Sequence, residues 1–346
     1  MKPKHIKKLL MDEIKKVSQS IEQYCFNPMK DFTRTRKLPI EKLMLGIIGM
    51  ESKSITNELL NYYDISPETP TASAFVQQRN KLKPEAFESV FKGFSQSLCF
   101  DGNIDFPMFA IDGSDIQIAT NPNDPSSYFP GANGQKDYNL LHLNALYNLD
   151  RHIYVDAVIQ NRRDANEHKV TFDFLPQSSR KNEPTLFYEL KFRVVRFQIS
   201  DDTYETILTN LDRMDYPPDK IKELYALRWG IETSFRNLKY TVGMLNFHSK
   251  KTACIKQEIY SHLIMYNFAE TVTSQVSIRK KQTKHTYRAN FSVAVHICRL
   301  YYRNKVTLSV LESIIAKNLI PIRLGRLRDR ALPKKRAYHG FLYRVA

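Results

Sequence analysis

The chain has little of what marks a secreted, disulfide-rich or membrane protein. Its 346 residues include four cysteines, Cys25, Cys99, Cys254 and Cys298, and no two of them are closely spaced. This scatter favours reduced thiols and argues against a zinc site. No run approaches the roughly 18 uncharged apolar residues of a membrane helix, and the charged start MKPKHIKKLL lacks the apolar segment of a secretory signal. We therefore expect a cytoplasmic protein with no membrane partner.

Acidic residues are scarce toward the C-terminus. The chain carries a net charge of +16, and residues 279–346 contain 17 lysines and arginines against two acids, a net charge of +15. Such a segment attracts polyanions, and the tyrosines among arginines in HTYRAN and RLYYRNK suit phosphate contact and base stacking. Nucleic acid is the expected partner; a solvated face or an anionic membrane surface is the alternative.

The hydrophobic pattern predicts three parts in a chain that is 42% hydrophobic and 12% aromatic. Residues 1–103 repeat apolar positions at helical spacing, with Ser54 or Thr56 as a helix cap, which predicts a helical domain that either binds DNA or serves only for packing. Residues 104–275 mix strand and helix patterns and predict an α/β domain. Residues 276–346 predict a basic segment of helix and tail.

Strand patterns dominate the first half of the middle part. FPMFAIDGSDIQI reads as a strand with an acidic end, and NLLHLNALYNLD and HIYVDAVIQ read as a hairpin joined at Asp150–Arg151. LFYELKFRVVRFQIS predicts another strand, whereas DTYETILTNL and PPDKIKELYALRWGIETSFRNLKYTVG predict helices. Asp112, at the predicted strand end before Gly113, could reach a metal or could simply belong to a turn. Asp115 should lie on the opposite strand face.

Polar residues interrupt the apolar pattern of YALRWGIETSFRNLK at four positions: Tyr225, Arg228, Glu232 and Lys239. On a continuous helix they fall within about 60° of one another, along the edge of an apolar stripe running from Leu224 to Leu238. That edge could aim polar groups into a cleft. Alternatively, an Arg228–Glu232 ion pair decorates a surface and contributes about 0.3–0.5 kcal/mol. A metal site would need a second acid, for which Asp112 is the candidate.

The spacing Y-x2-R-x3-E-x6-K, with the upstream Asp-Gly, resembles the signature of DDE transposases from bacterial insertion sequences of the insertion-sequence-four type. FTRTRKLPIEKLMLG and SAFVQQRNKLKPEAF are similar to that family as well, so the resemblance covers most of the chain. It implies an α/β, ribonuclease H-like (retroviral-integrase-like) core with a mixed sheet and helices on both faces. It also implies an N-terminal helical DNA-binding domain.

The resemblance assigns roles to five residues. Asp112 and Glu232 would be catalytic carboxylates that bind Mg²⁺ or Mn²⁺ for in-line attack on DNA phosphodiesters. Tyr225, Arg228 and Lys239 would hold transposon-end phosphates. The implied partners are double-stranded DNA, as transposon ends and target, and a second copy in a homodimer. The implied location is the nucleoid within the cytoplasm.

One motif of that family is missing. No Asp-Arg-Gly, which would carry the second catalytic acid, occurs in the chain. NRRDANEHKV joins TFDFLPQSSRKNEP near Val170–Thr171, which indicates an internal deletion, an incomplete core and a truncated β-rich insertion near 170–200. The substitutes that remain are Asp156, Asp164 and Asp173.

Four functional hypotheses follow from the missing motif. The first is a transposase that is impaired, or one that an unrecognised acid keeps active. The others are a non-catalytic DNA-binding remnant or inhibitor, a metal-dependent nuclease of the same fold, and a product that does not fold. Specific inverted-repeat ends tested against random duplex separate transposition from general nuclease activity.

Overall fold

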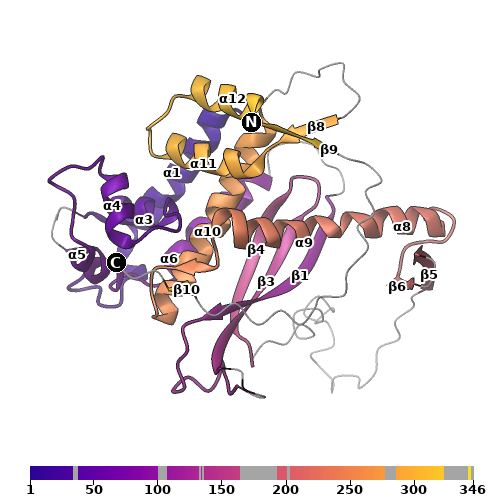
Figure 1. Cartoon of the computed structure of the whole chain (residues 1–346), viewed down its shortest axis with the longest axis horizontal. Helices are drawn as coiled ribbons and strands as arrows, with labels where there is room; N and C mark the ends of the chain where they lie inside the picture. Colours follow the sequence, from indigo (N-terminus) through magenta and orange to yellow (C-terminus); the bar gives the residue numbers. More distant parts are fainter. Residues whose placement is uncertain are drawn as a thin grey trace, which may run out of the picture.

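The computed structural model describes residues 1–33, 38–99, 107–131, 134, 136–163, 193–200, 203–276, 286–322 and 342–343. One hydrophobic cluster runs through these residues, from Ile6 near the N-terminus to Ile315 near the C-terminus. Most helices gather on one side of the molecule, and a twisted sheet lies beside them, so the coarse prediction of an α/β fold is confirmed (Figure 1).

The N-terminal part is helical, as its apolar spacing predicts. Its helices are α1 (Pro3–Gln19), α2 (Ile21–Tyr24), α3 (Ile40–Ile48), α4 (Ile55–Tyr62), α5 (Ala72–Arg79) and α6 (Glu85–Cys99). The predicted cap of α4 is Ser54, whose side chain accepts a hydrogen bond from the Asn57 amide at 3.4 Å. This bond satisfies one of the backbone donors that a helix start leaves open.

The main sheet contains β1 (Phe109–Ile118), β2 (Tyr128–Phe129), β3 (Tyr138–Asn148) and β4 (Ile153–Asn161). Within the described residues every pairing of this sheet is antiparallel, and β1 pairs only with β3. The β3–β4 hairpin turns at Asp150–Arg151, as predicted, and His152 has a left-handed φ of 56° beside that turn. The mixed sheet that the family resemblance implies is therefore not present among the described strands.

A long central helix joins the helical part to the sheet. α10 (Thr252–Ser274) is buried along most of its length and packs against α6, α11 and β4 (Figure 1). Because α10 is buried on all sides, with polar residues such as Glu258 and Asn267 among its buried apolar ones, no single apolar stripe marks it in the sequence. α10 therefore holds the first hundred residues against the sheet.

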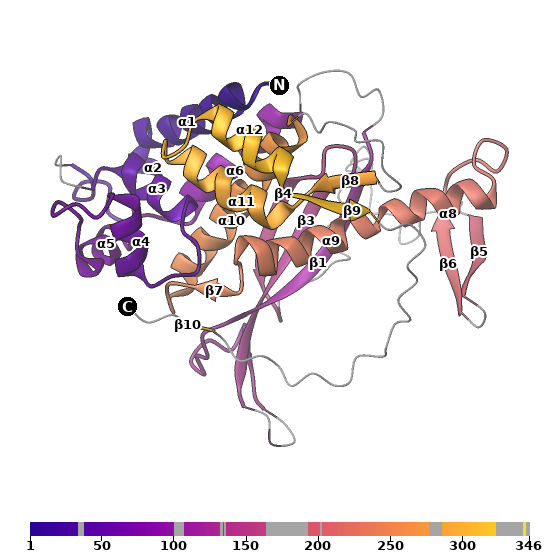
Figure 2. The same ribbon diagram turned by 45° about the horizontal axis from the view of Figure 1, so that its top comes forward.

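The segment with the four polar residues leads out of the core. α8 (Pro218–Leu227) and α9 (Trp229–Arg236) continue into the π-helix η2 (Asn237–Val242). Figure 1 and Figure 2 show α9 crossing the sheet and α8 projecting toward a separate hairpin of β5 (Arg193–Ser200) and β6 (Thr203–Thr209). Because α8 projects, the predicted apolar stripe is buried only from Ile231 onward, and Leu227 is 44% exposed.

The helix predicted from DTYETILTNL is wrong, because these residues form β6. They pair with β5 in an antiparallel register that sets Val195 opposite Ile207 and Arg196 opposite Thr206. Alternating exposure along β6 follows from that pairing, with Leu208 63% exposed on the outer face. A short segment of mixed propensity takes the structure that its partner strand imposes.

The C-terminal part returns to the core. It comprises β7 (Asn246–Phe247), β8 (Thr286–Ala289), α11 (Phe291–Tyr302), α12 (Leu308–Lys317), β9 (Leu319–Ile322) and β10 (Leu342–Tyr343). Phosphate contact and stacking through RLYYRNK are contradicted for Arg299 and Tyr302, which are 5% and 2% exposed. Arg299 donates instead to the Val242 carbonyl at 2.7 Å. Arg299 thereby holds α11 against η2, whereas the Tyr302 hydroxyl donates to the Leu45 carbonyl of α3 at 3.3 Å.

Several predictions are not tested by these elements. The boundaries at residues 103 and 275 stay predictions, as does the ribonuclease H-like character of the core. The proposed junction at Val170–Thr171, Asp164 and Asp173 lie outside the described residues. None of the helices in the described ranges combines the length and apolar character needed to cross a membrane.

Candidate functional site

Asp112 lies inside β1 and not at its end, which corrects the sequence prediction. The strand continues past Gly113 to Ile118 because each residue finds a partner on β3, with Asp112 opposite Ala145 and Gly113 opposite Asn144. Strand alternation places Asp112 on the same face as the buried Ala110. Its carboxylate is half-buried and accepts a hydrogen bond from the Gly113 amide at 2.8 Å.

The face of the sheet that carries Asp112 is the face that α9 covers. Ala110, beside Asp112, is opposite Tyr147, and Tyr147 is opposite Tyr154 of β4. The Tyr154 hydroxyl lies 2.8 Å from Ser234 Oγ of α9. Burial raises the pKa of Tyr154 well above its usual value, and the negative charge of Asp112 raises it further. Asp112 and α9 therefore lie on one side of the sheet.

Arg228 is the centre of the polar residues on α8 and α9. Its Nη1 lies 2.9 Å from Glu232 Oε1, and its Nη2 donates to the Tyr225 hydroxyl at 3.3 Å. Burial disfavours the guanidinium charge, but the bond to Tyr225 and the charge of Glu232 raise the Arg228 pKa overall. The ion pair weighed as a surface decoration is present, and it occupies the carboxylate expected to bind metal.

The guanidinium of Arg228 is also stacked between rings. Its central carbon lies 4.9 Å from the Tyr225 ring centroid and 5.4 Å from that of Trp229. Cation–π contacts of this kind strengthen where water is excluded. Sequence analysis missed the contribution of Trp229, although it is the only tryptophan of the chain.

Lys239 leaves the row expected for a continuous α-helix. It lies within η2, where the backbone widens, and its Nζ donates to the Asp115 carbonyl oxygen of β1 at 3.0 Å. Burial lowers the Lys239 pKa, and the nearby Asp115 opposes that shift. Among the described contacts, Lys239 joins η2 to the strand of Asp112, whereas Tyr225 and Glu232 both contact Arg228.

A second polar cluster lies on the opposite face of β1. Asp115 Oδ1 is 2.6 Å from His142 Nδ1 and 2.9 Å from Arg162 Nε. Because a carboxylate can only accept, His142 Nδ1 is the donor in its contact with Asp115. His142 Nε2 is 3.0 Å from Asn144 Oδ1, and Asn144 donates to Gln160 at 3.0 Å. Polar residues at every second position of neighbouring strands, as in Asn144 and His142 of β3, are the sequence signal that could have revealed this cluster.

The one described candidate for a replacement acid does not join Asp112. Asp156 pairs with Leu146 in the β3–β4 register and so faces away from Ala145, which shares the face of Asp112. Its side chain is 49% exposed and lies 3.7 Å from the Lys92 ammonium of α6. Asp156 therefore supplies no ligand beside Asp112.

The acidic and other metal-binding side chains do not form a complete site for a divalent metal among the described residues. Within the described residues, no group of three or more histidine, cysteine, aspartate or glutamate side chains is arranged to hold one. Mg²⁺, however, commonly binds through one or two carboxylates and completes its shell with water and substrate phosphate. Asp112 and Glu232 supply two carboxylates of the kind that this partial role needs, and the Glu232 carboxylate is paired with Arg228.

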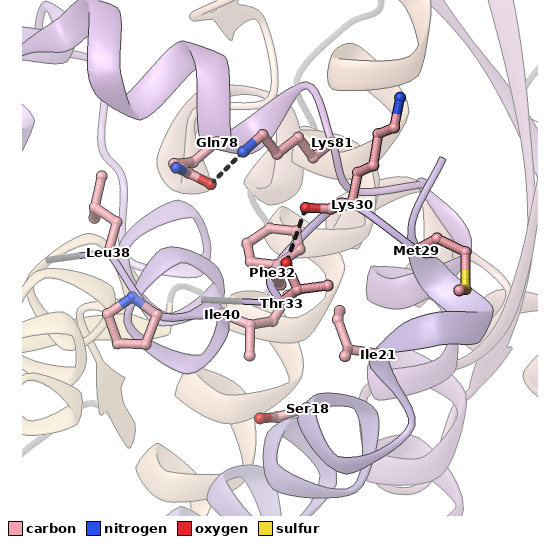
Figure 3. A pocket seen from close by; sticks show the side chains of 11 residues that line it. Ser18, Ile21, Met29, Lys30, Phe32, Thr33, Leu38, Ile40, Gln78 and Lys81 are labelled. Carbon is pink, nitrogen blue, oxygen red and sulfur yellow. Dashed lines mark hydrogen bonds between the residues drawn. The ribbon is translucent and has the colours of Figure 1, made fainter. Parts of the chain in front are cut away.

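A cavity of about 510 Å³ lies elsewhere, among α1, α2, α3 and α5. Figure 3 shows Phe32 in the middle of this cavity, with Gln78 and Lys81 joined by a hydrogen bond of 3.2 Å. None of the five predicted site residues lines it. The candidate site on the sheet and α9 is therefore separate from this cavity.

Comparisons with known proteins agree with the signature. Residues 173–268 match the family model of the transposase DDE domain, a span that includes Tyr225, Arg228, Glu232 and Lys239 but not Asp112. The transposase InsG for insertion sequence element IS4 of Escherichia coli strain K12 is 30% identical over 103 residues, which cover 29% of this chain and 23% of that protein. The chain thus matches about a quarter of the length of this relative.

A solved structure is also similar. The cryo-EM structure of the piggyBac transposase synaptic complex with hairpin DNA matches with a TM-score of 0.44 and 9% identity, covering 96% of this chain and 88% of that one. The family model and the InsG match confirm the predicted resemblance to DDE-type insertion-sequence transposases. They do not test the internal deletion.

Proposed function

Starting from a chain that resembles DDE-type insertion-sequence transposases, we propose that this protein acts on insertion-sequence DNA by metal-dependent strand cleavage and transfer. We further propose that its catalysis is impaired, because the motif for the second catalytic aspartate is missing. The observation that carries the proposal is that Asp112 and α9, which bears Glu232, lie on the same side of the sheet.

Each named residue has a role in this proposal. Asp112 and Glu232 hold Mg²⁺ or Mn²⁺, which when bound polarises a phosphodiester and activates the attacking oxygen. Arg228 binds a DNA phosphate through two parallel N–H donors, a geometry that suits guanidinium and phosphate. Tyr225 orients that guanidinium. Lys239, already against β1, adds a positive charge beside the strand of Asp112.

The basic C-terminal part supplies affinity for duplex DNA in this proposal. Its charge of +15 neutralises phosphates and releases their counterions, which favours association whatever the sequence. Transposon ends and target DNA are the proposed partners. A homodimer would bring two ends together, and DNA binding would place the protein at the nucleoid.

A DNA-binding remnant or inhibitor is the second candidate. The absence of Asp-Arg-Gly favours it, as does the unpaired outer edge of β1 within the described residues. A two-metal reaction needs both the attacking and the leaving oxygen to be held, so the loss of one ligand removes most of the rate. Such a protein would still occupy transposon ends.

The test is Mg²⁺- or Mn²⁺-dependent cleavage of DNA carrying the inverted repeats of the element, with random duplex of equal length as the control. Cleavage restricted to the repeat ends and lost in Glu232→Gln supports a working transposase. Equal cleavage of both duplexes points to a general nuclease. Retardation of the repeat DNA without cleavage supports the remnant, and neither binding nor cleavage by folded protein rejects the proposed function.

A further inference from the structure

A chain of hydrogen bonds links Glu232 to a residue on a different element. Tyr225 donates its single hydroxyl proton to Glu205 Oε1 of β6 at 2.9 Å. Its oxygen is then left as the acceptor for Arg228 Nη2 at 3.3 Å. The other terminal nitrogen of Arg228 holds Glu232 at 2.9 Å. Each of these three contacts pairs a donor with an acceptor, whereas the buried Arg228 Nε has no partner among the described residues.

Packing holds this chain in place from the side of the hairpin. Phe197 is opposite Glu205 in the β5–β6 register, and its ring centroid lies 6.1 Å from that of Tyr225. The Tyr225 ring thus packs against Phe197, and its hydroxyl is hydrogen-bonded to Glu205. Arg228 in turn stacks on the Tyr225 ring, so the position of the guanidinium depends on where the hairpin holds the tyrosine.

We propose that Glu205 is a positioning residue that keeps Arg228 on the Glu232 carboxylate and thereby keeps a divalent cation off Glu232 until a DNA phosphate draws Arg228 away. This inference rests on the proposed metal-binding role of Glu232. The guanidinium lies 2.9 Å from Glu232 Oε1, and its positive charge opposes the binding of a divalent cation at the same carboxylate. A phosphate offers Arg228 an alternative bidentate partner and frees Glu232.

The arrangement acts as a latch with a defined release. In the resting state the positive charge beside Glu232 is Arg228, supported through Tyr225 by Glu205. When DNA binds, the Arg228 guanidinium moves to a DNA phosphate, and a metal ion takes its place beside Glu232. Removing the Glu205 carboxylate loosens Tyr225 and Arg228 without removing either, so Glu232 becomes available in the absence of DNA.

The test measures Mn²⁺ binding to the full chain without DNA, by the loss of the paramagnetic resonance signal of free Mn²⁺. Glu205→Ala is expected to bind Mn²⁺ at least threefold more tightly than the wild type. Glu205→Gln retains an acceptor for the tyrosine and should remain near the wild type. Glu223→Ala, an exposed acid on α8, is the matched control and should leave the affinity unchanged. The double variant Glu205→Ala, Glu232→Gln should lose the increase in Mn²⁺ affinity that Glu205→Ala alone produces.

Trp229 fluorescence supplies a second readout, because the only tryptophan stacks on Arg228. Glu205→Ala should shift its emission and its quenching by acrylamide, while Glu223→Ala should not. If Glu205→Ala does not fold, Tyr225→Phe tests the same contact, since it keeps the ring and removes the hydroxyl. Its expected result is the same gain in Mn²⁺ affinity.

Equal Mn²⁺ affinity in the wild type, Glu205→Ala and Tyr225→Phe would overturn the inference. So would a gain that persists when Glu232 is replaced, and so would no Mn²⁺ binding by any variant. These measurements contain no DNA, so they are separate from the cleavage test. If Glu205→Ala binds Mn²⁺ more tightly but the protein neither binds nor cleaves repeat-end DNA, the role of Glu205 stands and the proposed transposase function is rejected.

Discussion

Asn267 of α10 serves as the hydrogen-bond partner of Tyr154 at the outer edge of β4. Its Oδ1 accepts from the Tyr154 amide at 2.8 Å, and its Nδ2 donates to the Tyr154 carbonyl at 2.7 Å. A side-chain amide thus replaces a neighbouring strand at an edge that would otherwise bury unpaired backbone groups. This contact joins the central helix to the sheet that carries Asp112.

Asn267→Ala should lower the free energy of unfolding by about 2–4 kcal/mol, because it leaves a buried backbone donor and acceptor without partners. The matched control is Asn57→Ala on the exposed face of α4, which should change stability by less than about 0.5 kcal/mol. Urea unfolding followed by circular dichroism measures both. Equal midpoints for the two variants would show that Asn267 does not hold the sheet edge.

A buried ion pair provides the second prediction. Arg79 of α5 and Glu258 of α10 are each 2% exposed, with Nη1 and Oε1 2.8 Å apart. Glu258→Gln should destabilise the protein by about 3–5 kcal/mol, because it leaves the Arg79 charge uncompensated. Glu88→Gln removes the exposed partner of Lys92 and should change stability by about 1 kcal/mol or less. Thermal melts at neutral pH compare them, and similar losses in both would contradict the argument.

Gly113→Ala should damage the strand that carries Asp112. A Cβ at this position would meet His142 Nε2 and Asn144 Oδ1, which are tied into the polar cluster on β3. The expected loss is about 1–3 kcal/mol. Gly46→Ala in α3 is the control, since its Cβ would have only the Phe75 ring at 3.9 Å, and helix propensity favours it by up to about 1 kcal/mol. Calorimetry that ranks Gly113→Ala as the more stable variant would reject this reading of β1.

Glu270 of α10 should make stability fall as the pH rises from about 4.5 to about 7. Burial raises the pKa of Glu270 from its usual 4.5 to about 7, and the charge of Arg288 opposes this only in part. The native state therefore binds the proton more tightly than the unfolded state, so this contribution is full below pH 4.5 and is lost through pH 7. Glu270→Gln should flatten the Tm profile over this window and melt higher than the wild type at pH 8. Parallel profiles would contradict the expectation.

Duplex DNA affinity should depend steeply on salt. If the basic C-terminal part neutralises six or more phosphates, the association constant should fall about a thousandfold or more between 50 and 200 mM salt. Retardation or anisotropy titrations with a duplex carrying the repeat ends measure this slope. A flat dependence would remove the basic segment from the DNA-binding argument. Truncation is a poor alternative, because Leu311 and Cys298 in this part are fully buried.

Sequence pattern predicted the sheet better than the site. Alternating apolar residues and the Asp150–Arg151 turn define the β3–β4 hairpin, and the signature pointed to Glu232 and Arg228 on one helix face. The partner that decides the conformation of Tyr225 is Glu205, in a segment whose own propensity predicts a helix. Local pattern cannot reveal such a contact, because β6 exists only through its pairing with β5.

The helix geometry failed for an equally physical reason. A single 100° period assumes one unbroken α-helix, whereas α8 ends at Leu227 and η2 begins at Asn237. Lys239 lies eleven residues after Arg228, about 16 Å along a helix axis, so it contacts Asp115 of β1, whereas Tyr225 and Glu232 lie within about one turn of Arg228 and contact its guanidinium. The residue types of the site were thus predictable, and their grouping depended also on distance along the axis, which an angle around the helix does not show.

The ten residues of α8 also make it a mechanical lever. At 1.5 Å per residue the helix is about 15 Å long, so a rotation of about 10° where it meets α9 would carry the hairpin through about 3 Å. Arg228 sits at that pivot, as the C-cap of α8. A displacement of the hairpin would therefore also move Arg228, the side chain that pairs with Glu232.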